Sequence, residues 1–277
     1  MAPGNKQHKL KYHLEKALIE GVRYIATFGG PYSNHIDAFV KRTVELGLQP
    51  IVVVRGEVQP SLTDTLRTAV CNGAILYPCS RQDYKRGLDS DVKRQVDSDF
   101  NTIYWIPEGG SGPLGVKGCQ DWAEGILNNN GSGGEPWDMV CLASGTGTTA
   151  AGFLSSSNVS QLAVFSALKG TKNLELDIRS QALVDTSGKH LLTFDECYHG
   201  GFGKFSPELF AFLCDVYSLN PTLKLDPVYT GKMLYQVQQL ITDGRWPYRR
   251  TLFIHTGGLQ GWRGVAKHHW PFDSIDY

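Results

Sequence analysis

The sequence predicts an α/β protein whose sheets are parallel and covered by helices on both faces. Short segments with strand character alternate with segments of helical periodicity along most of the chain. The strand segments are continuous apolar runs, which is typical of parallel strands buried on both faces. Four glycine-rich turns each follow one of these strands. No internal repeat interrupts this alternation.

The first elements can be placed from periodicity and end signals. Leu10, Leu14, Ala17 and Leu18 fall on one helical face. Ser33 or Asn34 is a natural N-cap for the second helix. The predicted strands of this half cover 23–28, 50–56, 74–77 and 102–107, and the predicted helices cover 33–47, 61–72, 82–99 and 115–128.

The same alternation continues after a polar stretch. Residues 128–136, rich in Asn and Gly, are predicted to form a loop. Strands are then predicted at 138–143 and 161–167, with helices from about 148 and near 171–184. One more strand should precede the turn at 255–261. The composition marks no domain boundary.

The bulk composition sets limits on fold and partners. A chain of 277 residues can form one large domain or two smaller domains that share a cleft. The apolar content of 41% and the charged content of 19% are ordinary for a globular protein. The 27 basic residues balance the 27 acidic ones, so we expect no nucleic-acid partner and no attraction to an anionic membrane.

Cysteine usage and hydropathy indicate the compartment. The six cysteines are scattered without a C-x-x-C pair, and no histidine lies at metal-finger spacing. This pattern favours a reduced, cytoplasmic protein without a metal site. The sequence shows no apolar run typical of a signal peptide or of a membrane span of about 20 residues.

The glycine-rich turns are the first candidates for a ligand site. They cover 29–35, 108–115, 144–149 and 255–261. In open α/β sheets, ligands bind at the carboxyl ends of the strands. A single such turn often only ends a strand, whereas four together indicate a shared ligand-binding rim.

The turn SGTGTT at 144–149 is the best candidate for binding an anion. Gly145 and Gly147 let the backbone approach a ligand, and the following helix offers free N–H groups. No Gly-Lys-Ser/Thr follows, so the turn is not a P-loop. It resembles a dinucleotide fingerprint, but the next strand ends without an acidic residue. A phosphate is therefore favoured over a dinucleotide, with a plain turn as the open alternative.

Lys6 lies in a Gly-led turn before an amphipathic helix. It is either a solvated lysine or a nucleophile that forms a Schiff base. The positive end of the following helix would favour the neutral amine, which lowers the lysine pKa. A carbonyl cofactor that bears a phosphate would need both this lysine and the 144–149 turn. Pyridoxal phosphate meets that description.

Six motifs in order make the resemblance specific. They are GNKQHKLKYHLEKAL, TFGGPYSNHIDAFVKRTVELGL, IPEGGSGPLGVKGCQDWAEGI, ASGTGTTAAG, DPVYTGKML and LFIHTGGLQG. Over nearly the whole chain the sequence resembles the pyridoxal-phosphate enzymes of the D-cysteine desulfhydrase and 1-aminocyclopropane-1-carboxylate (ACC) deaminase family.

The resemblance implies the tryptophan-synthase β-like fold, also called fold type II. This fold has two open, twisted, mainly parallel sheets covered by helices. Residues 1–30 and 116–277 would form the larger cofactor-binding domain, and 31–115 the smaller domain. The active site would lie in the cleft between them, and the family usually forms homodimers.

The resemblance also implies residue roles for the cofactor. Lys6 matches the lysine that binds the cofactor aldehyde, and Asn5 its neighbour. Asn34 matches the residue that bonds the ring 3-oxygen, although it could be only a helix cap. Tyr229 packs beside the cofactor, or is an ordinary half-buried tyrosine, and Thr256 approaches the ring nitrogen. The phosphate cup comprises Ser144, Gly145, Thr146, Gly147, Thr148 and Thr149.

Further residues are implied for substrate binding and catalysis. The substrate-side residues are Ser33, Asn34, His35, Phe202 and Thr230, and the catalytic ones are Lys6, Ser33 and Tyr229. For His35 a structural role is the alternative. Phe202 stands where many deaminases of the family have a tyrosine.

Two positions favour one activity within the family. Members that open the ACC ring resemble each other in carrying Glu at the position of Thr230 and Leu at that of Thr256. Desulfhydrase-like members carry small hydroxyl residues there, as this sequence does. We therefore expect β-elimination from a small D-amino acid, such as D-cysteine to pyruvate, hydrogen sulfide and ammonia. The alternatives are ACC deaminase, a broader D-amino-acid deaminase, and a catalytically weak homologue that binds pyridoxal phosphate.

Overall fold

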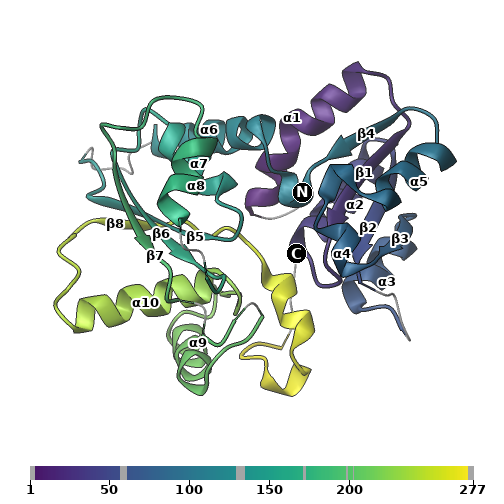
Figure 1. Ribbon diagram of the computed structural model, residues 1–277. Coiled ribbons are helices and arrows are strands. Elements are labelled where there is room, and N and C mark those ends of the chain that lie inside the picture. The colour runs from purple at the N-terminus through teal and green to yellow at the C-terminus, as the bar shows by residue number, and fades with distance from the viewer. Residues whose placement is uncertain are drawn as a thin grey trace. The chain divides into compact units, whose positions relative to one another are not determined.

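The computed structural model describes residues 4–56, 61–128, 135–170, 173–197, 199–201 and 203–273. The chain divides into two compact units, Met1–Gly115 and Val116–Tyr277, which we call the first and second units. Each unit contains one four-stranded sheet whose paired strands all run parallel (Figure 1).

The sheet of the first unit has the strand order β3-β2-β1-β4. Its strands are β1 (Tyr24–Gly29), β2 (Gln49–Arg55), β3 (Ile75–Cys79) and β4 (Ile103–Ile106). Its helices are α1 (Asn5–Ile19), α2 (Asn34–Glu45), α3 (Asp64–Cys71), α4 (Arg81–Tyr84) and α5 (Asp91–Asp99), with the 3-10 turns η1 (Gly87–Asp89) and η2 (Glu108–Gly110).

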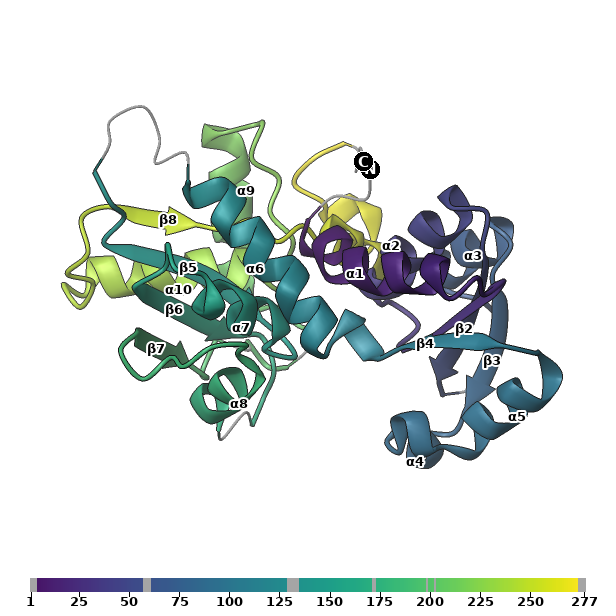
Figure 2. The same ribbon diagram turned by 90° about the horizontal axis from the view of Figure 1, so that it is seen from above.

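Alternate side chains of the central strands supply two cores in this unit. Val52 and Val54 of β2 join a buried cluster with residues of α1, α2 and α3. Ile51 and Val53 point to the other face, where the cluster includes Val96 of α5. Figure 2 shows α1 and α2 on one side of the strands and α4 and α5 on the other. The continuous apolar runs in the sequence follow from this burial on both faces.

The sheet of the second unit has the order β7-β6-β5-β8. Its strands are β5 (Met139–Ser144), β6 (Gln161–Ser166), β7 (His190–Phe194) and β8 (Thr251–Phe253). Its helices are α6 (Pro113–Leu127), α7 (Thr148–Ser155), α8 (Leu174–Gln181), α9 (Pro207–Leu219) and α10 (Thr230–Thr242), followed by the 3-10 turns η3 (Leu259–Gly264) and η4 (Lys267–His269).

This sheet also separates two cores. Val140 and Leu142 of β5 pack in a cluster with residues of α6, α7 and α8. Cys141 of the same strand packs on the opposite face, in a cluster with Met233 and Val237 of α10. In Figure 1, α6, α7 and α8 accordingly lie on one side of β5 and β6, and α10 lies on the other.

Helix α7, which follows the 144–149 turn, is held tightly against α6. All eight residues of α7 are buried. A Cβ atom added to Gly152 would lie 2.7 Å from the carbonyl oxygen of Val116 and would also collide with the Cys119 side chain. Since contacts this short do not occur, only glycine allows α6 and α7 to approach so closely.

The predicted fold class is confirmed, with differences in single elements. The helix predicted over 82–99 is interrupted, because Gly87 has a φ of 54° and Ser90 caps a new helix. No element was predicted between 185 and 250, where the structure has β7, α9 and α10. Of the loop predicted at 128–136, residues 129–134 lie outside the described residues.

The two units divide the chain differently from the predicted domains. Strand β1 pairs with β2 and with β4, so it belongs to the first sheet. Leu10 and Leu14 of α1 pack in the core of the same unit. Residues 1–30 therefore group with 31–115 rather than with 116–277. The predicted cleft between domains stays a prediction.

None of the helices in the described part of the chain is long and apolar enough to cross a lipid bilayer.

Candidate active site

In the first unit, the candidate site starts at the first turn of α1. Gly4 precedes this helix with a φ of 84°, a conformation that favours glycine. Asn5 is buried and Lys6 is half-buried. The Lys6 Nζ donates a hydrogen bond to Asn5 Oδ1 at 2.9 Å. The predicted nucleophile is therefore held by its neighbour at a helix start.

The N-terminus of α2 follows β1 and offers two kinds of polar group. The Ser33 hydroxyl oxygen caps the helix by accepting the His35 backbone N–H at 3.2 Å. The first amides of any helix lack partners within the helix, so they can bind an anion. The Asn34 Oδ1 atom is buried and has no partner among the described residues. A bound group could therefore add contacts at this helix start.

The orientation of the His35 ring follows from a chain of hydrogen bonds. The Thr27 hydroxyl donates to the Ile106 carbonyl at 2.9 Å. Its single hydrogen is then used, so at the 2.8 Å contact with His35 Nε2 it must be the acceptor. His35 thus carries its proton on Nε2, and Nδ1 is an acceptor. Within the described residues this buried Nδ1 has no hydrogen-bond partner.

Burial and nearby charges keep His35 neutral. Burial lowers the pKa of His35 well below its usual value, and the positive charges of Lys6, Lys9 and His13 lower it further. Lys6 is thus close enough to influence His35 electrostatically. The first unit brings together a lysine amine, helix amides and buried acceptors that stay uncharged.

In the second unit, the 144–149 turn is fastened by side chains. Gly147 has a φ of 80° and donates its N–H to the Ser144 hydroxyl oxygen at 3.2 Å. The Thr148 hydroxyl donates to Gln181 Oε1 at 3.1 Å. The Gln181 Nε2 donates back to the Thr146 carbonyl at 3.1 Å. Thr148 and Thr149 begin α7 and are buried. The turn therefore has a fixed shape at a helix N-terminus, as a phosphate cup requires.

Tyr229 lies beside this turn. A Cβ atom on Gly145 would be 3.4 Å from the Tyr229 hydroxyl oxygen, so the ring packs next to the bare glycine backbone. The side chain of Asp226 fixes the position of Tyr229. Its Oδ1 accepts the backbone N–H groups of Val228 at 3.0 Å and Tyr229 at 2.6 Å.

The second oxygen of Asp226 is engaged by Thr230. It accepts the Thr230 backbone N–H at 2.9 Å and the Thr230 hydroxyl. Burial raises the pKa of Asp226, and the hydrogen bonds from Thr230 and Tyr229 oppose that rise. Thr230 is itself fully buried. Its predicted contact with substrate stays a prediction, and its hydroxyl is already committed within the protein.

Thr256 lies at the same edge of the sheet as the phosphate turn. Strands β5 and β8 pair with Cys141 opposite Phe253, so the chain leaves both strands side by side. Thr256 is buried in the turn after β8. The cofactor residues predicted in the second unit are therefore gathered at one carboxyl edge, as open α/β sheets usually present them.

One predicted residue cannot be placed, and others were not predicted. Phe202 lies outside the described residues. The sequence reasoning missed Thr27, Gln181, Asp226 and the buried Lys232. Asp226 and Lys232 begin and end DPVYTGK, so the motif itself was a signal. Thr27 begins the motif TFGGPYSNH, so it had the same kind of signal. Gln181 carries no local signal, because only the tertiary structure brings it to the turn.

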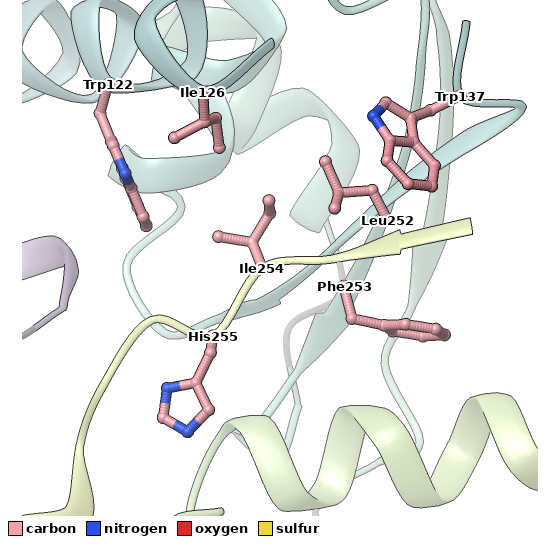
Figure 3. A pocket seen from close by; sticks show the side chains of 7 residues that line it. All are labelled: Trp122, Ile126, Trp137, Leu252, Phe253, Ile254 and His255. Atoms are coloured by element: carbon pink, nitrogen blue, oxygen red, sulfur yellow. The ribbon is translucent and has the colours of Figure 1, made fainter. Parts of the chain in front are cut away.

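Figure 3 shows a pocket of 390 Å³ in the second unit. It is lined by Trp122, Ile126, Trp137, Leu252, Phe253, Ile254 and His255. None of the predicted site residues lines it. His255 Nε2 donates to the Lys224 carbonyl and Nδ1 accepts the Gly257 N–H, so both ring nitrogens are used by the backbone. This pocket is mainly apolar and lacks the groups that a phosphate needs.

The described residues fit pyridoxal phosphate chemically. The cofactor needs an amine for its aldehyde, a cradle for its phosphate and polar contacts around its ring. In the first unit Lys6 would supply the amine, and in the second unit the 144–149 turn would supply an anion cradle. Asn34, whose buried Oδ1 has no partner among the described residues, and Tyr229, which packs beside Gly145, would add polar contacts.

Known proteins with similar sequences carry names from one family. The chain is 30% identical to a Thermotoga maritima protein named provisionally as a 1-aminocyclopropane-1-carboxylate deaminase, over 93% of this chain and 85% of that protein. It is 27% identical to the Arabidopsis thaliana bifunctional D-cysteine desulfhydrase/1-aminocyclopropane-1-carboxylate deaminase, over 93% of this chain and 69% of that protein. It is also 27% identical to a Klebsiella pneumoniae D-cysteine desulfhydrase, covering 92% and 82%. No family model matches the chain.

Solved structures agree. The crystal structure of an ACC deaminase homologue superposes with a TM-score of 0.73 at 25% identity, over 94% of this chain and 81% of that chain. A pyridoxal 5'-phosphate-dependent aspartate racemase shares the fold, with a TM-score of 0.63 at 14% identity over 92% and 80% of the two chains. This chain is therefore a pyridoxal-phosphate enzyme of fold type II and belongs to the family of D-cysteine desulfhydrase and ACC deaminase.

Proposed function

We propose that this enzyme catalyses β-elimination from a small D-amino acid, with D-cysteine giving pyruvate, hydrogen sulfide and ammonia. The observation that carries this choice is the state of Thr230 beside Tyr229. Ring-opening members of the family resemble each other in having a glutamate at this position. Here the side chain is a fully buried threonine whose hydroxyl donates to Asp226.

Asp226 cannot take the place of the missing glutamate. Each of its two oxygens already accepts two hydrogen bonds, from Val228, Tyr229 and Thr230. A carboxylate that is buried and saturated in this way would have to break structural bonds before it could exchange a proton with substrate. A carboxylate-assisted ring opening is therefore disfavoured, whereas elimination of a thiolate needs no second carboxylate.

The proposal assigns the following roles toward the cofactor. The cofactor, when bound, accepts the electron pair left on the substrate Cα. Lys6 would hold its aldehyde, the 144–149 turn would hold its phosphate, and Asn34 would contact the ring oxygen. Thr256 would approach the ring nitrogen with a neutral hydroxyl. Such a partner leaves that nitrogen less firmly protonated than a carboxylate would.

The substrate-side roles use groups that remain available. The Ser33 hydroxyl oxygen accepts the His35 N–H, which leaves its own hydrogen free to donate to the substrate carboxylate. The first amides of α2 would bind the same carboxylate. The Lys6 Nζ would accept the proton from the substrate Cα. The Cβ–S bond then breaks with both electrons leaving on sulfur, and Tyr229 can donate a proton to the departing thiolate. The unsaturated amine that remains takes up water to give pyruvate and ammonia.

A product assay tests the substrate assignment. Purified enzyme is given D-cysteine, L-cysteine or ACC, and sulfide, pyruvate and 2-oxobutanoate are measured. We expect sulfide and pyruvate from D-cysteine with a kcat/KM at least about tenfold above the value for 2-oxobutanoate formation from ACC. Faster release of 2-oxobutanoate from ACC would assign the chain to the alternative, ACC deaminase. Turnover of D-serine or chloro-D-alanine above that of D-cysteine would indicate a broader D-amino-acid deaminase.

The variant Thr230→Glu sharpens this assay. The longer carboxylate cannot share the fully buried site with Asp226 without repulsion, so we expect D-cysteine turnover to fall about tenfold or more. Thr230→Ser is the matched control, because it keeps the hydroxyl that donates to Asp226. The proposal loses its basis if Thr230→Glu retains full D-cysteine activity.

An alternative of another class is a homologue that binds the cofactor but turns over no amino acid. It would show the visible absorbance of bound pyridoxal phosphate and no product with any of these substrates. We also expect a homodimer located in the cytoplasm, with the site between two domains. Sedimentation of the purified holoenzyme measures the oligomeric state.

A further inference from the structure

Lys232 is a buried cation that the proposed reaction does not use. It lies in the first turns of α10, three residues after Tyr229, and only 1% of its surface is exposed. Its Nζ donates a hydrogen bond to the Gly201 carbonyl at 3.0 Å. Burying a charged lysine costs free energy unless hydrogen bonds or an opposite charge compensate it. Its partners therefore indicate its role.

The segment that Lys232 contacts has an unusual backbone. His199 has a φ of 44°, which is rare for a residue with a side chain. Gly200, Gly201 and Gly203 also have positive φ angles, of 87°, 128° and 71°. A run of left-handed residues forms neither a helix nor a strand. Such a segment keeps one conformation only when other groups hold it.

Two kinds of side-chain contact hold this segment, besides the backbone hydrogen bond from the Lys204 N–H to the Gly201 carbonyl at 3.1 Å. His199 Nδ1 lies 3.3 Å from the Ser206 hydroxyl, and its ring meets the Tyr235 ring edge-on at 5.2 Å between centroids. The second contact is the bond from Lys232 to Gly201. The contacts of His199 join the segment to Ser206, which follows it in the chain, and to Tyr235 of α10. The bond from Lys232 joins it to the buried N-terminal part of the same helix.

Lys232 is coupled to the groups that position Tyr229. Burial lowers the pKa of Lys232 to about 8, and the negative charge of Asp226 opposes that shift. Asp226 is the carboxylate that binds the backbone of Tyr229 and Thr230. Gly231 lets these parts approach, because a Cβ there would lie 2.6 Å from the Asp226 carbonyl oxygen. A buried acid and a buried base thus flank the turn that carries the predicted cofactor tyrosine.

We propose that Lys232 is a positioning residue that fixes residues 199–201 relative to Tyr229 and thereby shapes the part of the active site around that tyrosine. The inference rests on the proposed function, because Tyr229 is placed at the cofactor there. Lys232 itself contacts neither cofactor nor substrate. It acts through its hydrogen bond to the Gly201 carbonyl and through its place on α10, three residues after Tyr229.

The test compares three holoenzyme variants. Lys232→Met removes the donor and the charge while keeping a similar length, and Lys232→Gln keeps a neutral N–H donor. Lys189→Met is the matched control, because Lys189 is a partly buried lysine of the same unit that also donates to a backbone carbonyl, that of Ser156. Lys189 lies outside the site motifs.

Two measurements read out positioning. Amide hydrogen exchange of 199–201 and 203–206 should accelerate at least about tenfold in Lys232→Met and less in Lys232→Gln. The kcat/KM for D-cysteine should fall at least about tenfold in Lys232→Met, while the absorbance of the bound cofactor is retained. Lys189→Met should match the wild type in both measurements, even where its melting temperature falls.

Each result decides the inference. Wild-type exchange of the segment in Lys232→Met overturns it, because a merely structural lysine would lower thermal stability without this local effect. If Lys232→Met does not fold, the exchange rate of Lys232→Gln decides in the same way. If the wild type turns over no D-cysteine, the proposed function fails. The exchange measurement then still decides whether Lys232 holds the segment, since it needs no substrate.

Discussion

The two units share one strand order, yet they prepare their polar groups in different ways. In each, the first strand of the unit lies between the second and the fourth. At the start of α2 in the first unit, Asn34 and His35 have buried acceptor atoms without partners among the described residues. In the second unit, Asp226 has both oxygens filled and the 144–149 turn is tied to Gln181.

This difference suggests a division of labour. Buried acceptors without partners cost free energy, so they persist where a bound group completes them or where function needs them. Saturated networks are rigid and hold a shape before any ligand arrives. We therefore expect substitutions in the first unit to change chemistry most. Substitutions in the 144–149 turn of the second unit should mainly change cofactor affinity.

The largest effect is expected from Lys6→Ala. The variant lacks the amine that binds the cofactor aldehyde, so turnover should fall at least about 1000-fold and the visible absorbance of the bound cofactor should shift. Lys11→Ala is the control, since Lys11 lies on the same helix and is exposed. A Lys6→Ala enzyme with full activity would remove the basis of the assignment.

A smaller effect is expected from Gly147→Ala in the phosphate turn. A side chain at this positive φ costs about 1 kcal/mol, and the new Cβ would press on Gln181 Nε2 at 3.0 Å. We expect pyridoxal phosphate to bind about tenfold more weakly, measured by titration of the apoenzyme. Gly170→Ala is a matched control, because Gly170 has a φ of 83° and open space around it.

Comparing Gly147→Ala with Gly170→Ala separates a general effect of backbone strain from a specific loss of phosphate binding. Both variants carry a similar backbone strain, and Gly147→Ala adds the close contact with Gln181. Only Gly147→Ala should lose cofactor affinity. Equal cofactor affinities in the two variants would mean that the turn does not hold the phosphate.

The smallest effect is expected at His35 and concerns pH. Because the pKa of His35 is lowered in the folded state, the unfolded chain takes up a proton near pH 6.5 that the folded chain refuses. Stability is therefore lost as the pH falls below about 6.5, by up to about 1.4 kcal/mol per pH unit. His35→Gln keeps a donor for Thr27 and has no such group to protonate. Its free energy of unfolding should decline less steeply between about pH 6.5 and 5.5.

Denaturant unfolding at several pH values measures this difference. His35→Asn places an acceptor near the position of Nδ1 and is the companion variant. Identical slopes in the wild type and in both variants would show that His35 does not stay neutral in the folded protein.

Local signals were enough for much of the fold. The strands are apolar runs bounded by glycine, and each is buried by helices on both faces, so the sequence pattern and the burial have one cause. The interruption at Gly87 was not predicted, because the residues on both sides of this glycine favour a helix and the sequence does not reveal its positive φ. Strand β7 was missed because it is short and partly exposed, with neither a clear run nor a clear alternation.

The candidate site was only partly accessible from the sequence. Lys6, Asn34 and the 144–149 turn lie in local motifs and could be found by their residue types. Thr27 sets the His35 tautomer from a neighbouring strand, and Gln181 clamps the turn from 35 residues away in the chain. Such contacts depend on tertiary structure, so no periodicity or spacing announces them.

The close seating of α7 on α6 at Gly152 limits how this enzyme can change over evolutionary time. Even a single methyl group there would collide with the backbone of the neighbouring helix and with Cys119. The 144–149 turn leads into the first turn of α7. A collision at Gly152 that shifts α7 would therefore also shift this turn. We therefore expect selection to remove substitutions at Gly152, an interior position that takes no part in the reaction, as strictly as it removes substitutions of Lys6.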